Sequence, residues 1–553
     1  MEKIWLKSYP PGIPAEIDPG EYGSLVDLLE RSVARFRKRV AYLNMGASLT
    51  YGQLDEASRR FAAYLQTVLK LPRGSRVAIM LPNLLQYPVC MFGALRAGCV
   101  VVNCNPMYTA RELQHQLADS GAETIVILEN FAHTLEQALP GTAIRHVVMA
   151  RLGDMLGFPK GPAINFFVKH VLRKVPAWRL EACTDFRDCL SAGSRHRFEP
   201  VTVTRDDIAF LQYTGGTTGV SKGAMLTHGN MLANLLQAHA WVRSVVTDDG
   251  ELIVTALPLY HIFAMTANCF LMIRVGATNL LITNPRDIPA FVAELARHPF
   301  TIVTGVNTLF NALLNDERFR RLDFSRLKVS LGGGTAVQKP VAERWKALTG
   351  KALIEAYGLT ETSPAVTVNP IDLPEYNGTI GLPVPSTEVA IRDDDGNDVP
   401  LGETGELCVR GPQVMKGYYN QPAETIAVFT PDGFLRTGDL VAMNGDGYLR
   451  LVDRKKDLIL VSGFNVYPNE VEEVAAMHPG VADVAAIGVP DAKTGEAVKL
   501  FVVRREPSLT AEQLIALCRA NLTRYKVPTQ VEFRDELPKT NIGKILRRAL
   551  REG

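Results

Sequence analysis

The sequence contains no closely spaced cysteine pair. Eight cysteines are scattered over 553 residues, and none begins a Cys-x-x-Cys motif. The patterns typical of zinc sites and of disulfide-stapled scaffolds are therefore missing. We expect reduced thiols that serve only structural purposes.

Long apolar runs are also missing. The two most apolar stretches, 87–104 and 266–283, are interrupted by Arg96 and Arg274 and contain glycines. A membrane span needs about 20 predominantly apolar residues, so both stretches are expected in the core. Residues 1–8 include two lysines and a glutamate and lack the apolar segment of a secretory signal. These features predict a cytoplasmic protein.

Charge of one sign does not dominate. Sixty basic and 58 acidic residues give a net charge of +2, which argues against nucleic acid as a partner. A composition of 47% hydrophobic and 21% charged residues is typical of a globular enzyme. Because a single core stops growing near roughly 250–300 residues, two to four domains are expected.

Helical and β-type patterns alternate along most of the chain, which predicts an α/β fold. Two α/β blocks in tandem are expected up to Gly381, followed by a small β-rich subdomain with Gly/Asp turns. After the charged run 453–457 a new pattern of strands and helices begins. We therefore divide the chain into a large N-terminal domain, 1–453, and a small α+β C-terminal domain, 454–553.

A glycine- and threonine-rich segment at 211–223 carries the strongest chemical signal. Glycines let backbone N–H groups close around phosphate oxygens, hydroxyls add donors and a lysine adds charge. A Walker A loop is excluded because Lys222 is followed by glycine, and a purely structural turn is the alternative. The predicted phosphate-binding residues are Tyr213, Thr214, Gly215, Gly216, Thr217, Thr218, Gly219 and Lys222.

Four later motifs occur in an order that makes the chain recognisable. They are Tyr-Gly-Leu-Thr-Glu at 357–361, Arg-Thr-Gly-Asp at 436–439, Asp-Arg-Lys-Lys-Asp at 453–457 and Pro-Lys-Thr-Asn-Ile-Gly-Lys at 538–544. Together with the glycine-rich segment they resemble the signatures of the adenylate-forming superfamily, and most of all those of bacterial long-chain fatty-acyl-CoA synthetases. The resemblance covers the whole chain and implies a mobile C-terminal domain. It also implies two half-reactions: a fatty acid and Mg-ATP give acyl-AMP and pyrophosphate, and CoA then displaces AMP.

The resemblance also assigns the first half-reaction to particular residues. Lys544 would reach the carboxylate and the α-phosphate, and a lysine in an ordinary basic tail is the alternative. Glu361 would hold Mg²⁺, with Thr214 near the metal and Thr360 at the α-phosphate. The remaining nucleotide contacts would come from Gly333, Gly334, Tyr357, Gly358, Asp439 and Arg454. Of these, Asp439 would accept the ribose hydroxyls.

The second half-reaction needs a different arrangement, because the lysine must leave before a thiol can approach. By the same resemblance, Lys456 is the hinge, and Ser462, Gly463 and Phe464 line the CoA path. A solvated charge cluster is the alternative for Lys456. His261 would join the catalytic residues as a gate beside the carboxylate, and a histidine satisfied in the core is equally compatible with its apolar surroundings.

The segment 163–175 (Ala163 to Val175) predicts a basic amphipathic helix. Apolar residues recur at helical spacing with lysines, arginine and histidine off the stripe, and prolines lie on both sides. A surface helix that packs on the core is the alternative. Because the substrate is insoluble, we expect this helix to give peripheral contact with the inner face of the cell membrane. The resemblance also suggests a homodimer.

The sequence thus predicts a long-chain fatty acid–CoA ligase that uses ATP, Mg²⁺ and CoA. The nearest alternative is a fatty-acyl-AMP ligase that passes the acyl group to a carrier protein. A non-catalytic nucleotide- or lipid-binding regulator and a P-loop NTPase are disfavoured, the first by the intact catalytic motifs and the second by the failed Walker spacing.

Overall fold

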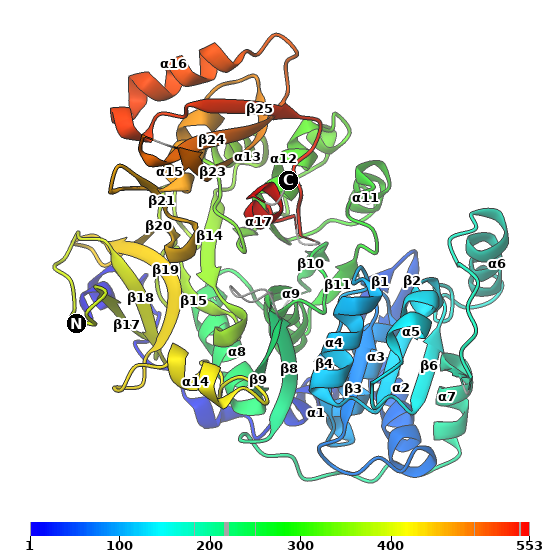
Figure 1. The fold of residues 1–553 in the computed structure, drawn as a ribbon. Helices are drawn as coiled ribbons and strands as arrows, with labels where there is room; N and C mark the ends of the chain where they lie inside the picture. The colour runs from blue at the N-terminus through cyan, green and yellow to red at the C-terminus, as the bar shows by residue number, and fades with distance from the viewer. Residues whose placement is uncertain are drawn as a thin grey trace.

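The computed structural model describes residues 2–181, 183–214, 221–248, 250–491, 493–540 and 543–551. Within these ranges four β-sheets with their helices organise the chain (Figure 1). Two large sheets and a small antiparallel sheet belong to the first four-fifths of the sequence, and the fourth sheet belongs to the C-terminal part.

The first sheet carries the glycine-rich segment at one edge. Its order is β7-β6-β5-β3-β4-β8-β9, parallel except for the antiparallel hairpin β8–β9. Central strands are buried on both faces and therefore read as continuous apolar runs. The strands are β3 (Arg76–Met80), β4 (Val100–Asn103), β5 (Thr124–Leu128), β6 (His146–Ala150), β7 (Cys183–Asp185), β8 (Ile208–Thr214) and β9 (Lys222–Thr227).

Helices that accompany the first sheet bury the first apolar stretch noted in the sequence. Every residue of α3, Gln86–Arg96, is buried, which confirms that 87–104 is core. Arg96 is neutralised there by Asp55, at 2.7 Å, and by Glu30, at 3.1 Å. The other helices of this part are α1 (Leu25–Phe36), α2 (Tyr51–Ala63), α4 (Ala110–Ser120), α5 (Ala132–Ala138) and α7 (Phe186–Ser194).

The second sheet draws strands from distant parts of the chain. Its order is β16-β15-β14-β13-β12-β10-β11-β1-β2, and Tyr42 of β1 pairs with Asn279 of β11. The two expected α/β blocks are present, but they do not follow one another strictly along the chain, because the first two strands, β1 and β2, join the second sheet. The strands are β1 (Val40–Asn44), β2 (Ala47–Thr50), β10 (Leu252–Thr255), β11 (Thr278–Leu281), β12 (Ile302–Gly305), β13 (Val329–Gly332), β14 (Leu353–Gly358), β15 (Ala365–Val368) and β16 (Leu382–Pro383).

Helices of the second block follow its strands at regular intervals. The run 266–283 is divided among a π-helical turn, a short helix and β11, all largely buried. The helices are α8 (His228–Val242), α9 (Ile262–Ala264), α10 (Leu271–Val275), α11 (Ile288–Leu295), α12 (Asn307–Asn315) and α13 (Lys339–Thr349).

The β-rich subdomain predicted after Gly381 is an antiparallel four-stranded sheet. Its strands are β17 (Glu388–Arg392), β18 (Gly405–Arg410), β19 (Leu435–Met443) and β20 (Leu449–Arg454), and α14 (Pro422–Val428) lies between the second and third. The 3₁₀ turn Lys455–Asp457 follows β20 directly. The predicted charged run therefore ends one sheet and leads into the next.

The C-terminal sheet packs against its own helices above the larger part of the molecule (Figure 1). Its strands are β21 (Ile459–Val461), β22 (Phe464–Val466), β23 (Val481–Asp491), β24 (Gly495–Arg504) and β25 (Gln530–Arg534), and its helices are α15 (Pro468–Ala476), α16 (Ala511–Asn521) and α17 (Arg547–Arg551). Two hydrogen bonds join this part to α12. Thr308 donates to the carbonyl of Gly543 at 3.4 Å, and the Asn311 amide donates to the carbonyl of Ala482 at 3.5 Å.

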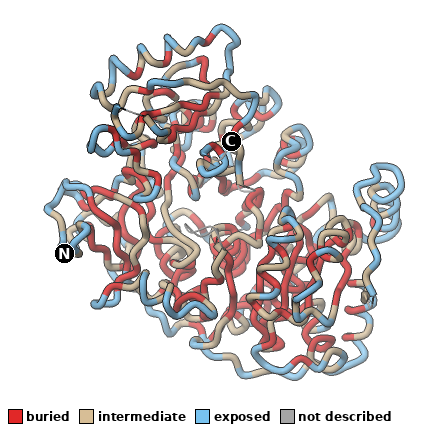
Figure 2. The backbone as a smooth tube through the Cα atoms, in the orientation of Figure 1, coloured by how far each residue is buried: buried red, intermediate tan, exposed pale blue. Residues whose placement is uncertain are grey.

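The basic amphipathic segment stands out at one side of the molecule. It forms α6 (Lys160–Phe166) and a π-helical turn, Phe167–Val171. Figure 2 shows this helix largely exposed, whereas the sheets are buried. Phe166 is 63% exposed and Val171 is 55% exposed, so the alternative of a helix packed on the core is wrong. No helix in the described ranges has the length and apolar character needed to cross a membrane.

Candidate active site

A buried carboxylate, Asp439, forms the centre of the site where β14, β19 and β20 meet. The Tyr357 hydroxyl donates to Asp439 Oδ2 at 2.6 Å, and Arg454 Nε lies 3.3 Å from Oδ1. Arg454 is brought there by strand register, since it pairs with Asp439 across β19 and β20. Burial, and then the Asp439 charge, raise the pKa of Tyr357, so its hydroxyl keeps its proton and donates.

Glu361 lies in a 3₁₀ turn, Thr360–Thr362, that follows β14 directly. The Tyr418 hydroxyl donates to Glu361 Oε1 at 2.8 Å, and the Met415 N–H donates to the Glu361 carbonyl at 2.8 Å. Burial raises the pKa of Glu361, and the Tyr418 hydrogen bond opposes that rise. Gly358 has to be glycine, because a Cβ there would lie 2.0 Å from the Pro364 carbonyl oxygen.

Lys544 enters this region from the opposite end of the chain. Its N–H donates to Thr540 Oγ1 at 3.1 Å, and its carbonyl accepts from the Thr540 N–H at 2.7 Å, which closes a tight turn. Burial lowers the pKa of Lys544 to about 7. The positive charges of Arg454, Arg547 and Lys456 also lower this pKa, whereas the negative charge of Asp439 raises it. The structure therefore brings Lys544 into the electrostatic field of the Asp439 cluster, about 100 residues away in sequence.

His261 also belongs to this neighbourhood. Burial, and then the charge of Lys544, lower the pKa of His261 to about 4, so the imidazole is neutral at pH 7. Its Nδ1 accepts from the Phe263 N–H at 3.4 Å at the start of α9. A neutral imidazole beside Lys544 is consistent with a residue that lines or gates the carboxylate site. It is not consistent with a residue that supplies a permanent positive charge.

The ends of the glycine-rich segment are held in place. Thr214 ends β8 and Lys222 begins β9, and these two residues pair across the antiparallel strands, while Gly215, Gly216, Thr217, Thr218 and Gly219 lie outside the described residues. Tyr213 donates to Asp119 Oδ2 at 2.5 Å. Lys222 forms an ion pair with Glu424 of α14, and its Nζ lies 5.5 Å from the centre of the Tyr418 ring.

The two predicted glycines at 333 and 334 directly follow β13. A Cβ on Gly333 would lie 3.0 Å from the Phe263 ring and 3.2 Å from the Ala356 carbonyl oxygen. Gly334 has φ +78°, which favours glycine. A side chain at position 333 would therefore crowd the Phe263 ring and the backbone of β14.

The predicted hinge and CoA residues lie on the C-terminal side. Lys456 occupies the 3₁₀ turn after β20. Ser462 and Gly463 form the turn of the β21–β22 hairpin with positive φ, and Phe464 stacks on Tyr525 at a centroid distance of 4.9 Å. Residues 462–465 at the turn of this hairpin are exposed, whereas Asp439 is buried.

Sequence reasoning missed four residues that the structure adds to the site: Asp119, Thr308, Tyr418 and Glu424. Each lies far in sequence from the residue that it contacts. The pair Tyr418-Tyr419 after Gly417 carried no local pattern that could have identified a contact with Glu361.

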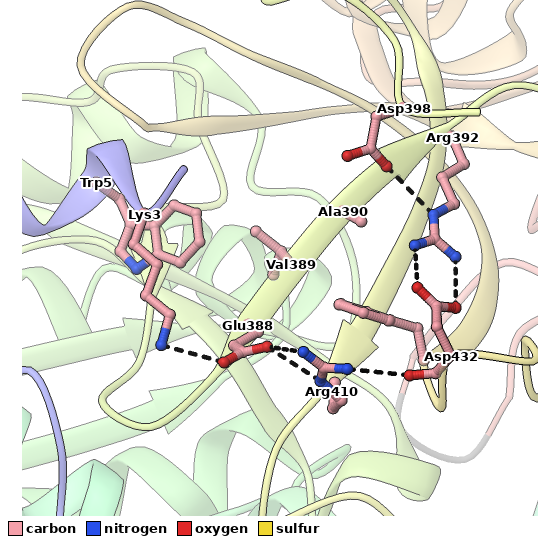
Figure 3. Close-up of a pocket in the computed structure, with 10 residues that line it drawn as sticks. Lys3, Trp5, Glu388, Val389, Ala390, Arg392, Asp398, Arg410 and Asp432 are labelled. Carbon is pink, nitrogen blue, oxygen red and sulfur yellow. Dashed lines mark hydrogen bonds and ion pairs between the residues drawn. The ribbon is translucent and has the colours of Figure 1, made fainter. Parts of the chain in front are cut away.

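A separate pocket of about 410 Å³ lies on the small antiparallel sheet (Figure 3). Lys3 and Arg410 contact Glu388, and Arg392 contacts Asp432 and Asp398. Both arginines, Arg392 and Arg410, also stack on Phe434. Because each cation already faces a carboxylate, this pocket presents no uncompensated charge to a ligand.

The fold and the enclosed cluster of carboxylate, tyrosine and lysine define a nucleotide-binding enzyme with a separate C-terminal part. Comparison with known proteins agrees: residues 29–419 match the family described as AMP-binding enzyme, and residues 470–544 match the AMP-binding enzyme C-terminal domain. The chain belongs to the AMP-binding enzyme family.

Relatives and solved structures cover nearly the whole chain. It is similar to a long-chain-fatty-acid–CoA ligase of Yersinia pestis, 60% identical over 552 residues, covering 100% of this chain and 98% of that protein. The structure is similar to the anthranilate CoA ligase AuaEII in complex with anthranoyl-AMP, with a TM-score of 0.84, 25% identity and coverage of 97% and 98%. It is also similar to ATP-bound MatB from Rhodopseudomonas palustris, with a TM-score of 0.79, 28% identity and coverage of 95% and 98%.

Proposed function

We propose that the protein is a long-chain fatty acid–CoA ligase that forms an acyl-adenylate from a fatty acid and ATP and then transfers the acyl group to CoA. The observation that carries this proposal is the placement of Lys544 in the field of the Asp439–Tyr357–Arg454 cluster. The names of full-length relatives at 59–60% identity support a fatty acid as substrate and CoA, rather than a carrier protein, as acceptor.

In the first half-reaction, a carboxylate oxygen of the fatty acid attacks the α-phosphorus of ATP. The new P–O bond forms as the bond to the β-phosphate oxygen breaks, and pyrophosphate leaves with that electron pair. Both reactants are anions, so the site must supply positive charge. We assign this charge to Lys544, with Thr360 at the α-phosphate and Lys222 on the pyrophosphate side.

The nucleoside contacts follow from the same cluster. Asp439 presents a buried carboxylate that suits the ribose hydroxyls, and Arg454 orients it. The closely packed Gly333, together with Gly334 and the Tyr357 ring, would enclose the adenine.

Magnesium fits the oxygen groups near β14. Glu361 offers a carboxylate with one oxygen fixed by Tyr418, and Thr214 offers a hydroxyl, both of which are ligands that Mg²⁺ prefers. When bound, Mg²⁺ would neutralise phosphate charge. These residues would hold it against the triphosphate.

For the second half-reaction we propose that residues 454–553 rotate about Lys456. Asp453, on the N-terminal side of that hinge, accepts from the Asn469 N–H at 2.8 Å and lies 3.6 Å from Arg547, so rotation would break contacts that now cross the boundary. Ser462, Gly463 and Phe464 would then line the path of the CoA thiol. The thiolate attacks the acyl carbonyl, and AMP leaves with the electrons of the cleaved C–O bond.

We further propose that α6 and the turn after it dock on an anionic membrane surface at the inner face of the cell membrane. Phe158, Phe166, Phe167, Val171 and Leu172 are exposed large apolar residues. Arg173 and Lys174 follow them and form no ion pair within the described part of the chain. An apolar face beside cations suits such a surface, which would also hold the fatty acid.

We also propose that the protein is a homodimer, and light scattering at twice the 60.7 kDa chain mass would support this.

Product analysis by mass spectrometry tests the activity. The purified protein is incubated with Mg-ATP and a series of saturated fatty acids, with and without CoA. Acyl-CoA and AMP in stoichiometric amounts support the ligase. Acyl-adenylate that accumulates in the presence of CoA would contradict CoA as acceptor, and ADP as product would contradict the adenylate pathway.

A further inference from the structure

The segment 415–419, between β18 and α14, lies along the edge of the hairpin that carries the glycine-rich loop. The Met225 N–H donates to the Gly417 carbonyl at 2.9 Å, and the Lys416 N–H donates back to the Met225 carbonyl at 3.0 Å. The Tyr419 N–H donates to the Gly223 carbonyl at 2.8 Å. These bonds fix the backbone on both sides of Tyr418 against β9.

The side chain of Tyr418 makes two different contacts. Its hydroxyl donates to Glu361 Oε1 at 2.8 Å. Its ring centre lies 5.5 Å from Lys222 Nζ, within the range of a cation–π contact. Only 9% of Tyr418 is exposed, so water competes little for either contact.

We propose that Tyr418 is a positioning residue for the first half-reaction, which orients the Glu361 carboxylate toward a divalent cation and holds the Lys222 ammonium on the pyrophosphate side. This inference rests on the proposed function. The Tyr418 residue is outside the sequence motifs described above.

The hydroxyl and the ring of Tyr418 act on different residues: the hydroxyl on Glu361 and the ring on Lys222. A carboxylate is free to turn about its last bond, and a donor on Oε1 removes that freedom and leaves Oε2 for the cation. The ring attracts Lys222 through its electron-rich face and leaves the ammonium protons for oxygen acceptors. Glu424 is such an acceptor in this structure. Phosphate oxygens would take its place when ATP binds.

Two substitutions separate the tasks. Tyr418→Phe removes the hydroxyl and keeps the ring, whereas Tyr418→Leu removes both. With Mn²⁺ and α,β-methylene ATP as probes, the free Mn²⁺ signal in electron paramagnetic resonance reports metal affinity without turnover. We expect Tyr418→Phe to weaken Mn²⁺ binding roughly 10-fold, the lower end of the effect of losing a partner of a metal ligand. Tyr418→Leu should weaken nucleotide affinity several-fold beyond Tyr418→Phe.

The matched control is Tyr419→Phe, because Tyr419 packs into the apolar cluster of the first sheet. It should bind Mn²⁺ as the wild type does, and Glu361→Gln should abolish binding. Wild-type Mn²⁺ affinity in Tyr418→Phe would overturn the orienting role. Equal nucleotide affinity in the Phe and Leu variants would overturn the role of the ring.

Failure of the proposed function gives a different result. If the wild type forms acyl-adenylate and Tyr418→Phe keeps full Mn²⁺ affinity, only the role of Tyr418 is wrong. If Glu361→Gln binds Mn²⁺ as the wild type does, the metal assignment is wrong and the inference falls with it.

Discussion

The ammonium group of Lys544 is buried among other cations, and burial first and these charges second set its protonation before substrates bind. Arg454, Arg547 and Lys456 all oppose its charge, and only Asp439 favours it among the residues that perturb it most. With a pKa of about 7, the lysine is mostly neutral at pH 8 in the free enzyme. Anionic substrates would restore its charge.

Lys544→Ala should slow acyl-adenylate formation by roughly 10²–10³-fold, because the substituted site cannot neutralise the approaching anions. Thioester formation from supplied acyl-adenylate should be largely unchanged, since the lysine acts only in the first step. Rapid-quench assays of each half-reaction measure both rates. Equal losses in the two half-reactions would contradict the assignment.

ATP binding should be coupled to proton uptake by Lys544. Since its pKa of about 7 in the free enzyme should rise beside phosphate, close to one proton should be taken up at pH 8 and much less at pH 6, where the lysine is already charged. Calorimetry in buffers of different ionisation enthalpy measures this number. Lys544→Ala should show none of this proton uptake. Equal uptake in the variant and the wild type would mean that a group other than Lys544 takes up the proton.

Glu355 should make stability fall as pH rises. Burial raises the pKa of this carboxyl to about 8, against the usual 4.5, so the folded protein binds more protons than the unfolded chain between these values. Glu355→Gln keeps an oxygen acceptor for the Val337 N–H, now at 3.0 Å, and removes the titration. Its melting temperature should exceed that of the wild type by a margin that grows by a few degrees from pH 5 to pH 8. A difference in melting temperature that does not change with pH would contradict the predicted pH dependence.

At the residue scale, motifs identified the groups but not their partners. The resemblance named Glu361, Asp439 and Lys544, and the structure then placed Tyr418 on Glu361 and Tyr357 on Asp439. Such contacts depend on which strands become neighbours. Local spacing therefore could not reveal that Lys222 pairs with Glu424, although both charges are evident in the sequence.

At the element scale, apolar periodicity in the sequence predicts some of the strands and helices within a few residues of their observed bounds. The sequence pattern predicts a helix over 511–521 and a strand over 124–128, and the structure has both with these bounds, because each combines clear apolar periodicity with distinct ends. Helical spacing of apolar residues over 53–68 predicts one continuous helix, but in the structure the α-helix covers Tyr51–Ala63 and a π-helical turn, Tyr64–Val68, follows. That change of hydrogen bonding has no signature in apolar spacing.

The exposed face of α6 leads to a test of membrane contact. Phe167→Asp with Val171→Asp should abolish co-sedimentation with vesicles of anionic phospholipid, because charge replaces the apolar face and repels the lipid. The matched control is Leu401→Asp with Ile426→Asp, which alters two exposed apolar residues, 53% and 76% exposed, in the β-rich part. Equal sedimentation of both double variants and the wild type would contradict the proposal.

At the scale of the whole molecule, the order of the large and small parts was predicted, while their orientation was not. The C-terminal part is joined to α12 through Thr308 and Asn311, whose contacts with Gly543 and Ala482 follow from tertiary packing alone. The motif order implied that Lys544 reaches the nucleotide site. Only the structure shows the surface against which its loop rests.

A cross-link across this surface should separate the two half-reactions. A Cβ on Gly543 would lie 3.8 Å from the Thr308 Cβ, within the range of a disulfide, so Thr308→Cys with Gly543→Cys can be oxidised to a bridge. We expect the bridged protein to retain adenylate formation and to lose thioester formation, because the C-terminal part cannot rotate. Reduction should restore the second step. Each single cysteine variant is the control, and full thioester formation by the bridged protein would contradict rotation.

The pairing of β1 with β11 has a consequence for synthesis on the ribosome. Tyr42 leaves the ribosome long before Asn279, its partner in the second sheet. At about 5–20 residues per second, the hairpin β1–β2 waits roughly 10–50 s for that partner, while strands β3 to β9 of the first sheet are completed in the meantime. The nascent chain therefore exposes the unpaired edge of β1 beside a finished sheet, and in the cell this is the interval in which a chaperone would have most to protect.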